Sequence, residues 1–253
     1  MSAPPFLSVV VPTYNEAEGI TECVAALRAE LPRLASTWEI VVADDGSEDG
    51  TADIVEGLAA AEPRIRALRF PHRGKGATVR DGLLAARGEW RFMADADLST
   101  APAEIQRFLD VAGSHVDIAI GSRQTRDGGV RQGETLSRYV IGRGFNLMTR
   151  LIALPGIYDT QCGYKLLSAR AVTTICPHLR IDGFAFDVEL LFLARRAGLA
   201  VRSVGVTWRC RQNGRVAVRR GASAFLDVVR IRLSASRGEY SAMVGPALTR
   251  TRH

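Results

Sequence analysis

The chain has 253 residues and a formal net charge of +6; 47% of its residues are hydrophobic, 24% charged and 7% aromatic. This composition excludes disordered, collagen-like and fibrous proteins, and the length suits one large domain. Because no segment approaches the roughly 20 apolar residues of a membrane-spanning helix, and the N-terminus lacks the regions of a secretory signal, we expect a cytoplasmic protein.

Short aliphatic runs alternate with helical patterns over the first half of the chain. We expect strands at residues 7–11, 38–43, 65–70, 90–94 and 117–121. We expect helices at residues 20–31, with Pro32 closing the helix or closely following its last turn, from Thr51 onward, at 77–86 and at 102–111. This alternation is typical of β–α–β units, so it predicts an α/β fold with a doubly wound, mostly parallel sheet.

The second half of the chain has a weaker pattern. We expect a mobile, glycine- and charge-rich loop at residues 124–134, then helical spacing from 136 to 154. A helix at 188–197, a strand at 201–206 and a helix at 222–233 follow, with a disordered tail at 241–253. The four cysteines form no C-x-x-C pair, so we expect buried free thiols rather than a zinc or redox site.

Polar segments follow the predicted strands at four places. These segments are residues 14–16, 44–47, 73–76 and 95–100. Ligands bind at the carboxyl ends of the strands in open parallel sheets. We therefore expect the four segments to converge on one crevice.

The segment Asp95-Ala96-Asp97 places two carboxylates close together where a strand runs out into a loop. Oxygen ligands of this kind suit Mg²⁺ or Mn²⁺, which also bridges phosphate oxygens. An ordinary alternative is that Asp97 caps a helix that begins near Pro102. The pattern alone leaves both interpretations open.

Two further segments favour a nucleotide. A carboxylate in Asp44-Asp45-Gly46-Ser47 can accept hydrogen bonds from a nucleobase or a ribose, although the same residues also build turns. Arg73-Gly74-Lys75-Gly76 offers cations and little side-chain bulk just before a helix, which suits phosphate. The pattern matches neither a Rossmann nor a P-loop fingerprint.

Several motifs together resemble one family. Residues 9–16 (VVVPTYNE), 44–47 (DDGS) and 95–97 (DAD) resemble the signature of family 2 inverting glycosyltransferases of GT-A fold. Residues 73–76 (RGKG), 121–123 (GSR), 159–165 (DTQCGYK) and 183–189 (GFAFDVE) resemble the polyprenyl (dolichyl) phosphate β-glucosyltransferase branch. Dolichyl-phosphate mannosyltransferases are related to this branch.

The resemblance implies roles for individual residues. It places Pro12, Tyr14, Glu16 and Asp45 at the nucleoside, and Lys75, Asp95 and Ala96 along the rest of the nucleotide sugar. It assigns the metal, Mg²⁺ or Mn²⁺, to Asp95 and Asp97, with Ser99 nearby, and the acceptor phosphate to Arg123 and Arg138. An acceptor phosphate needs no general base, whereas a hydroxyl does. The candidates for a base are Asp159, Asp187 and Glu189.

The implied function is inverting transfer of a sugar, with UDP-glucose the favoured donor and a GDP-sugar the alternative, to a polyprenyl phosphate. The implied architecture is one GT-A domain over residues 1–240. Residues 1–125 would carry the nucleotide sugar, and residues 126–240 the acceptor, with a C-terminal helical extension. The alternatives are transfer to a soluble hydroxyl or phosphate acceptor, and nucleotide-sugar binding without turnover.

The C-terminal fifth is strongly basic. From residue 201 onward, eleven arginines stand against Asp227 and Glu239, which gives +9 and leaves −3 for the first 200 residues. Two interpretations of this region are open. A basic amphipathic helix here could make peripheral contact with the cytoplasmic membrane face, or it could pack on the body of the protein with an arginine-rich exterior. Without a recognised module or interleaved aromatic residues, we expect no nucleic-acid partner.

Overall fold

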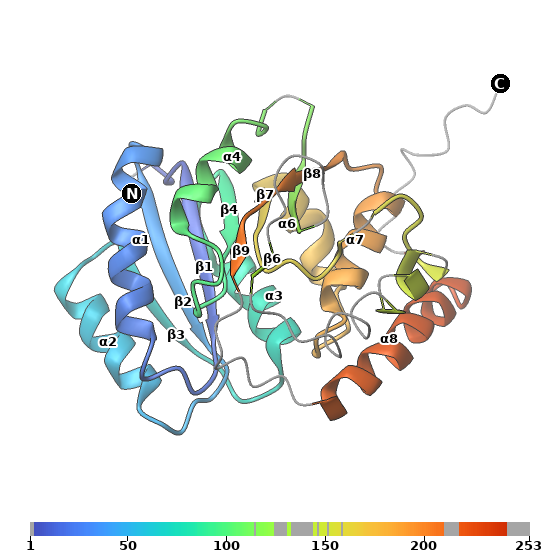
Figure 1. Ribbon diagram of the computed structural model, residues 1–253, viewed down its shortest axis with the longest axis horizontal. Helices are drawn as coiled ribbons and strands as arrows, with labels where there is room; N and C mark the ends of the chain where they lie inside the picture. The colour runs from blue at the N-terminus through green and yellow to red at the C-terminus, as the bar shows by residue number, and fades with distance from the viewer. Residues whose placement is uncertain are drawn as a thin grey trace.

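The computed structural model describes residues 3–113, 115–123, 131–132, 144–145, 147–150, 152–157, 159–209 and 218–241. Its centre is a seven-stranded sheet with the order β3-β2-β1-β4-β7-β5-β8 (Figure 1). The strands of this sheet are β1 (Leu7–Thr13), β2 (Trp38–Asp44), β3 (Ile65–Arg69), β4 (Trp90–Met93), β5 (Ile118–Ser122), β7 (Lys165–Ser168) and β8 (Val201–Gly205). A separate pair is formed by β6 (Arg131–Gln132) and β9 (Trp208–Arg209).

Helices connect and cover the strands. They are α1 (Ile20–Leu34), α2 (Thr51–Ala61), α3 (Lys75–Ala85), η1 (Pro102–Glu104), α4 (Ile105–Leu109), α6 (Ala169–Ile175), η2 (Cys176–His178), α7 (Phe186–Arg196) and α8 (Val218–Ser236). The prediction that Pro32 closes the first helix or follows its last turn is wrong, because Pro32 lies within α1, which continues to Leu34 and ends with the Ala35 amide bonded to the Leu31 carbonyl. Pro32 has no amide proton to donate to the Arg28 carbonyl oxygen, so α1 continues past it with one backbone hydrogen bond fewer.

All pairings in the main sheet are parallel except those of β7, which runs antiparallel to β4 and to β5. The expected α/β, doubly wound and mostly parallel sheet is confirmed. Both β7 and α6 were missed by the sequence analysis. β7 has only two apolar residues, between Lys165 and Ser168, so it shows neither alternation nor a long aliphatic run.

Two layers of helices bury the two faces of the sheet. Along β1, Val9 and Val11 pack with α1, α2 and α4, whereas Val10 between them packs with α3, α6 and α7. This alternation follows from the two-residue period of a strand. Figure 1 shows α1 and α2 at one end of the molecule and α8 at the other.

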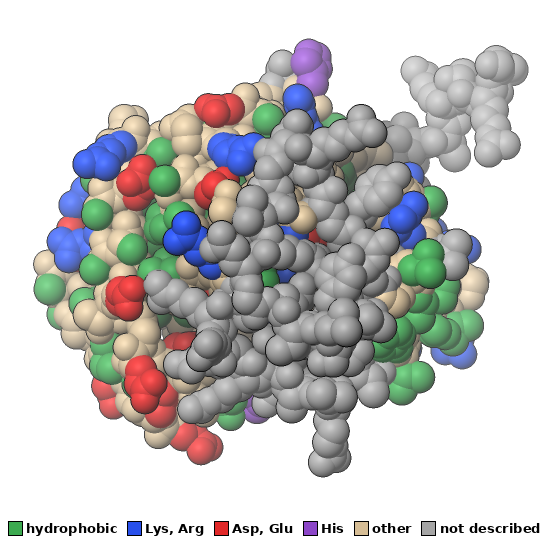
Figure 2. Space-filling view, in the orientation of Figure 1, with side chains coloured by type: hydrophobic (Ala, Val, Ile, Leu, Met, Phe, Trp, Pro, Cys, Tyr) green, Lys and Arg blue, Asp and Glu red, His purple; other side chains and the backbone are tan. Residues whose placement is uncertain are grey.

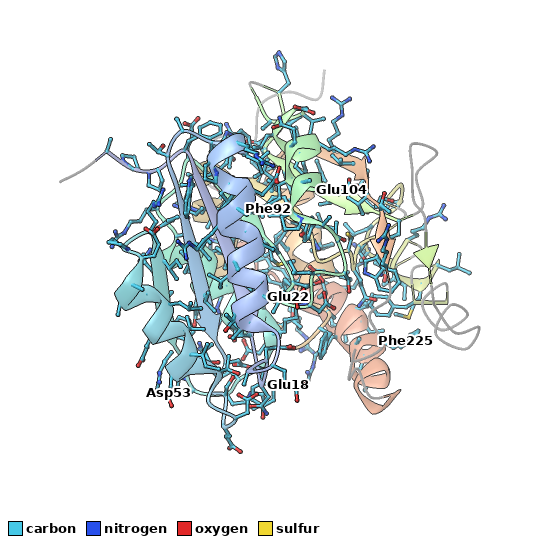
Figure 3. All side chains as sticks on the ribbon, turned by 60° about the vertical axis from the view of Figure 1, so that its left-hand side comes forward. Glu18, Glu22, Asp53, Phe92, Glu104 and Phe225 are labelled. Carbon is cyan, nitrogen blue, oxygen red and sulfur yellow. The ribbon has the colours of Figure 1, made fainter. Side chains whose placement is uncertain are left out.

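An aromatic cluster fixes β7 in the sheet. The ring of Phe92 in β4 meets Phe108 of α4 at 5.1 Å and Tyr164 at 4.9 Å, both edge to face. Figure 3 shows Phe92 behind α1, in the interior of the molecule. Edge-to-face rings add about 1 kcal/mol to the burial of their surface. The residue before β7 is thereby anchored beside β4.

Parts of the predicted pattern lie outside the described residues. These are the loop at 124–130 and 133–134, much of the helical spacing at 136–154, and the tail from 242 onward. Among the described residues, no helix is long and apolar enough to cross a bilayer.

Candidate functional site

Three neighbouring strands end side by side and give one polar edge. Thr13 at the end of β1 lies opposite Asp44 of β2, and Val10 of β1 lies opposite Met93 of β4. The loops that follow these strands therefore leave the sheet next to one another. Hydrogen bonds join residues 14–16 to 44–47, 44–47 to 73–76, and 73–76 to 95–100, which confirms that the four segments converge.

The loop after β2 is a turn built on Asp44. The Asp44 carboxylate accepts hydrogen bonds from the amides of Gly46 at 3.1 Å and Ser47 at 2.9 Å. Ser47 Oγ in turn accepts from the Asn15 amide at 2.9 Å, and Asn15 Oδ1 accepts from the Glu48 amide at 2.9 Å. The turn thus also holds the loop after β1. Of the two adjacent carboxylates, Asp44 therefore has a structural role in this turn.

The other carboxylate, Asp45, holds the glycine-rich loop. Its Oδ1 accepts from the Arg73 amide and its Oδ2 from the Gly74 amide, each at 3.0 Å. His72 Nδ1 lies 3.0 Å from Asp45 Oδ2. Gly74 has φ +119°, and a Cβ there would lie 2.5 Å from the Asp182 carbonyl oxygen, so only glycine fits. Asp45 is 3% exposed and fixes this loop against the end of β2.

An aromatic pair stands beside this loop. The rings of Tyr14 and His72 stack with centroids 4.3 Å apart and planes 25° apart, and Tyr14 is 37% exposed. Pro12 and Glu16, on either side of Tyr14, are half-buried, and the Glu16 amide donates to Thr51 Oγ1 at 2.9 Å. An exposed ring held by a second ring is suited to stacking on a planar group such as a nucleobase.

Lys75 and Asp95 form an ion pair across the edge, with Nζ 2.6 Å from Oδ1. Burial alone would raise the pKa of Asp95, but the charges of Lys75, Lys165 and Arg123 outweigh it and hold that pKa below its usual value. Burial likewise would lower the pKa of Lys75, and the Asp95 charge more than compensates. Asp95 is therefore an anion in a cationic setting, followed by buried Ala96.

Asp97 is exposed, and its Oδ1 accepts from the Ser99 amide at 2.8 Å. The alternative that Asp97 caps the helix near Pro102 is wrong. The residue at that cap is Ala101, and no side chain bonds there. Asp97 is left with oxygen lone pairs that face solvent.

The two carboxylates fit a divalent metal ion that is shared with a phosphate ligand. Within the described part of the chain, no group of three His, Cys, Asp or Glu side chains is placed to hold a metal. Mg²⁺ typically binds one or two carboxylates together with substrate phosphates and water. Asp95 and Asp97 supply that number and kind of ligand.

The segment 159–165 crosses next to the same edge. A Cβ built on Gly163 would overlap Asp95 Oδ2, so the carboxylate lies directly against the Gly163 backbone. Tyr164 donates its hydroxyl to the Thr100 carbonyl oxygen at 2.6 Å. The loop before β7 therefore limits how Asp95 can lie.

Lys165 and Asp187 form a buried ion pair beneath this loop, with Nζ 2.7 Å from Oδ1. Lys165 is 1% exposed, and its Nζ also donates to the Cys162 carbonyl oxygen at 2.5 Å. Burial raises the pKa of Asp187, and the neighbouring Lys165 charge offsets part of that effect. The pair joins β7 to the first turn of α7.

Arg123, at the end of β5, is clamped by Asp159. Its Nε and one terminal nitrogen each lie 2.8 Å from a different oxygen of the Asp159 carboxylate, which has no exposed side-chain surface. The guanidinium also lies 5.5 Å from the ring centroid of Trp208 in β9. The adjacent Arg209 amide donates to the Ser99 carbonyl oxygen at 2.8 Å, which brings β9 over the Asp97 loop.

Glu189 lies elsewhere. Its Oε2 accepts from the amides of Arg180 and Ile181 at 2.9 and 2.8 Å, and its Oε1 accepts from the Tyr240 hydroxyl at 2.6 Å. Burial raises the pKa of this fully buried carboxyl. The structure does not bring it to the edge where Asp95 lies, and Arg138 is outside the described residues.

Three residues at the edge were not singled out from the sequence. Gly163 touches Asp95, Lys165 neutralises Asp187, and Trp208 lies over Arg123. Each belongs to the second half of the chain, where no spacing rule links it to Asp95. The only available signal was that Gly163 and Lys165 sit inside the family-like motif at 159–165.

The sequence model of Glycosyl transferase family 2 matches residues 8–175, about two thirds of the chain. The chain belongs to this family. The matched span contains Asp45, Lys75, Asp95, Asp97 and Arg123.

Several relatives of this family 2 protein are dolichyl-phosphate beta-glucosyltransferases. The chain is 37% identical over 214 residues to a dolichyl-phosphate beta-glucosyltransferase of Trichomonas vaginalis, covering 80% of this chain and 64% of the relative. It is 33% identical over 216 residues to that of Dictyostelium discoideum, covering 80% and 66%. It is 32% identical over 216 residues to the human protein, covering 80% and 67%. The match thus spans about two thirds of the length of these relatives.

Solved structures show the fold. Glucosyl-3-phosphoglycerate synthase from Mycobacterium tuberculosis, crystallised with Mn²⁺, UDP-glucose and glycerol 3-phosphate, superposes with a TM-score of 0.67 at 20% identity. The superposition covers 91% of this family 2 chain and 79% of that chain. Mannosyl-3-phosphoglycerate synthase from Rubrobacter xylanophilus gives 0.62 at 20% identity, covering 98% and 77%. The expected GT-A-like fold is confirmed.

Proposed function

We propose that this protein transfers glucose, with inversion, from UDP-glucose to a polyprenyl phosphate, and that a divalent metal ion assists the reaction. The observation that carries the proposal is the single polar edge on which Asp45 binds the glycine-rich loop and Lys75 of that loop pairs with Asp95, with Asp97 exposed two residues further on. Relatives named dolichyl-phosphate beta-glucosyltransferases support the sugar and the lipid acceptor.

The donor half of the proposed site is formed by residues 1–125. Tyr14, stacked on His72, would receive the uracil ring, with Pro12 and Glu16 beside it. The Asp45 carboxylate binds two amides and lies 3.0 Å from His72 Nδ1, and its remaining lone pair can accept from the nucleoside. Lys75 would supply positive charge to the diphosphate.

Asp95 and Asp97 would hold Mg²⁺ or Mn²⁺, which stabilises the negative charge that grows on the leaving nucleotide. The two carboxylates differ in their surroundings. Asp95 is kept anionic by Lys75 and pressed against Gly163, whereas Asp97 is exposed. Buried Ala96 between them keeps the loop against the sheet.

The acceptor half would be formed by residues 126–240, together with Arg123 at its border. Arg123 would orient the acceptor phosphate, because a guanidinium fork matches phosphate oxygens. Asp159 would fix the plane of that fork. Arg138 stays a prediction for the same phosphate.

We propose no general base, since an acceptor phosphate is already anionic at neutral pH. Catalysis then consists of positioning and charge neutralisation. Asp159 and Asp187 are each bound to a cation, and Glu189 is bound to two amides and a tyrosine. We assign the first two to positioning and Glu189 to the packing of α7.

The protein would work on the cytoplasmic face of a membrane, because the hydrocarbon chain of a polyprenyl phosphate lies in a bilayer. The three described cysteines are buried free thiols, which agrees with a reducing compartment.

The experiment is nucleotide release by the purified protein with Mn²⁺ across a panel of UDP- and GDP-sugars. Each donor is tested alone, with a short polyprenyl phosphate and with soluble phosphate or hydroxyl acceptors. We expect release from UDP-glucose that depends on the lipid. Release that depends on a soluble acceptor, or nucleotide-sugar binding without any release, would overturn the proposal.

A further inference from the structure

Helix α8 has two apolar sides. One side is packed on the body of the protein and contains Ala224, Val228 and Ile231, none more than 4% exposed. The other side carries Leu226, Val229 and Leu233, which are 70%, 43% and 48% exposed. We call these three residues the outer strip.

The helical register places the outer strip directly away from the body. Ala224 and Leu233 are nine residues apart, about two and a half turns, so they lie on opposite sides of the helix. Phe225 lies between the two sides, and its ring packs edge to face on Phe145 at 5.3 Å. The outer strip is therefore not the margin of the core but a separate apolar face. Such a face is unusual on a surface helix.

Arginines flank the outer strip. Arg230, Arg232 and Arg237 are exposed, and the only acidic side chain described within α8 is Asp227, which pairs with Arg230 at 3.2 Å. Figure 2 shows hydrophobic side chains gathered with Lys or Arg side chains at the right-hand edge, where Figure 1 places α8. The surface combines an apolar centre with a cationic border.

The inner side of α8 is connected to the proposed donor site. A Cβ on Gly183 would lie 3.7 Å from Asp227 Oδ2, so α8 lies against the 182–183 loop. The neighbouring Asp182 carbonyl oxygen accepts from the Gly76 amide at 2.7 Å, which joins that loop to the glycine-rich loop. Only α8 and the 182–183 loop therefore separate a surface in contact with the outer strip from the glycine-rich loop that carries Lys75.

We propose that the outer strip of α8 docks the protein reversibly on an anionic membrane surface. The inference rests on the proposed function, since a polyprenyl phosphate acceptor is found in such a surface. Leu226, Val229 and Leu233 would enter the boundary between headgroups and acyl chains, and Arg230, Arg232 and Arg237 would meet anionic headgroups.

The charge pattern is what favours lipid over another occupant. A second copy of the chain would bring the same arginines against themselves, and like charges oppose such contact. Three apolar side chains are few for a stable protein interface, whereas they suit a weak, reversible membrane contact that lipid charge strengthens.

The test is flotation of the full chain with phosphatidylcholine vesicles, with and without phosphatidylglycerol. We expect binding to the anionic vesicles that salt weakens, and little binding to the neutral ones. Replacing the outer strip (Leu226→Ser, Val229→Ser and Leu233→Ser together) is expected to weaken binding about tenfold or more. Leu84→Ser, which removes a 41% exposed leucine from α3, should leave binding unchanged.

Wild-type protein that stays with the soluble fraction, or a triple variant that floats as well as wild type, would overturn the proposal. So would sedimentation that shows a dimer which the triple variant dissociates, because the strip would then join two copies. Circular dichroism checks the fold of the triple variant. If it is unfolded, Leu226→Ser alone carries the test, since Leu226 is the most exposed of the three.

Transfer assays separate this inference from the proposed function. In solution with a short, soluble polyprenyl phosphate, the triple variant should match wild type, whereas it should lose most transfer to acceptor embedded in anionic vesicles. If wild type transfers to neither acceptor but still floats through the outer strip, the proposed function fails and the docking surface stands.

Discussion

The two sides of the polar edge are held in different ways. After β1 and β2, carboxylates and hydroxyls bind backbone amides, as in the turn on Asp44 and the contacts of Asp45 with the glycine-rich loop. Around β5, β7 and α7, side chains bind side chains, as in Arg123–Asp159 and Lys165–Asp187. Asp95 lies between the two regions and contacts both Lys75 and Gly163.

This difference has consequences for how each region responds to change. A turn held by hydrogen bonds from several backbone amides keeps its shape when one side chain is replaced by a similar one, because the remaining hydrogen bonds still hold it. Removing one member of a buried ion pair lowers the stability of the fold, since the remaining charge is left buried without compensation. We therefore expect substitutions in the first region to affect ligand binding, and substitutions in the second to affect the fold or the acceptor.

The largest expected effect is on turnover, at the exposed carboxylate. Asp97→Ala should lower kcat/KM about a thousandfold, or about 4 kcal/mol, because one of two metal ligands is lost. The thermal midpoint should stay within a few degrees of wild type, since Asp97 is exposed. The measurement is lipid-dependent UDP release against Mn²⁺ concentration. Unchanged turnover at every concentration would remove Asp97 from the metal site.

The next effect is on stability. Lys165→Met should lower the free energy of unfolding by about 3 kcal/mol, because Asp187 keeps a buried charge without its partner. Urea unfolding measures this loss. The double variant Lys165→Met with Asp187→Leu should recover most of it, since an apolar pair leaves no buried charge. A single variant as stable as wild type would contradict the buried pair.

A third substitution tests the contact that joins the two regions. Gly163→Ala should lower kcat about thirtyfold, or about 2 kcal/mol, because the added methyl group displaces the Asp95 carboxylate. Gly57→Ala, at a helical position with nothing within 4 Å of the added carbon, is the matched control and should keep full activity. Equal activity of the two variants would show that Asp95 does not depend on Gly163.

A smaller effect is expected at the acceptor side. Arg123→Lys should raise the KM for the polyprenyl phosphate about tenfold, because lysine cannot reproduce the two-pronged contact. The affinity for UDP should change little. Steady-state kinetics with the acceptor varied, and calorimetry with UDP, separate the two effects. Equal losses in both would contradict the assignment of Arg123 to the acceptor.

The smallest effect concerns the aromatic pair. Tyr14→Ala should weaken UDP binding about fivefold, or about 1 kcal/mol, because one stacking surface is lost. Tyr14→Phe is the control and should bind UDP as wild type does. An alanine variant with unchanged affinity would show that the ring stacked on His72 is not a base platform.

The first region could be predicted from the sequence for a physical reason. Strands β1 and β2 have aliphatic runs, and β4 is a short run that is apolar except for Arg91. In a parallel sheet the residues after such strands share an edge, so Asp45, Lys75 and Asp95 could be placed together. The capping alternative for Asp97 could not be resolved, because it depended on which residue begins η1.

The second region could not be predicted in the same way. The short antiparallel strand β7 lies between β4 and β5 in the sheet, and no pattern in the local sequence predicts that position. The contact of Gly163 with Asp95 and the pairing of Lys165 with Asp187 depend on that insertion. A glutamate such as Glu189 could serve either as a catalytic acid or as a structural residue. Only its partners in the structure, the Arg180 amide and the Tyr240 hydroxyl, show that it is structural.

The most direct test of the proposed function is the product itself. Wild-type protein is incubated with UDP-glucose, Mn²⁺ and a short polyprenyl phosphate, and the lipid fraction is examined by mass spectrometry and proton NMR. We predict a glucosyl polyprenyl phosphate with a β anomeric linkage, which follows from inversion of the α-linked donor. An α linkage, or glucose found only on a soluble molecule, would contradict the account.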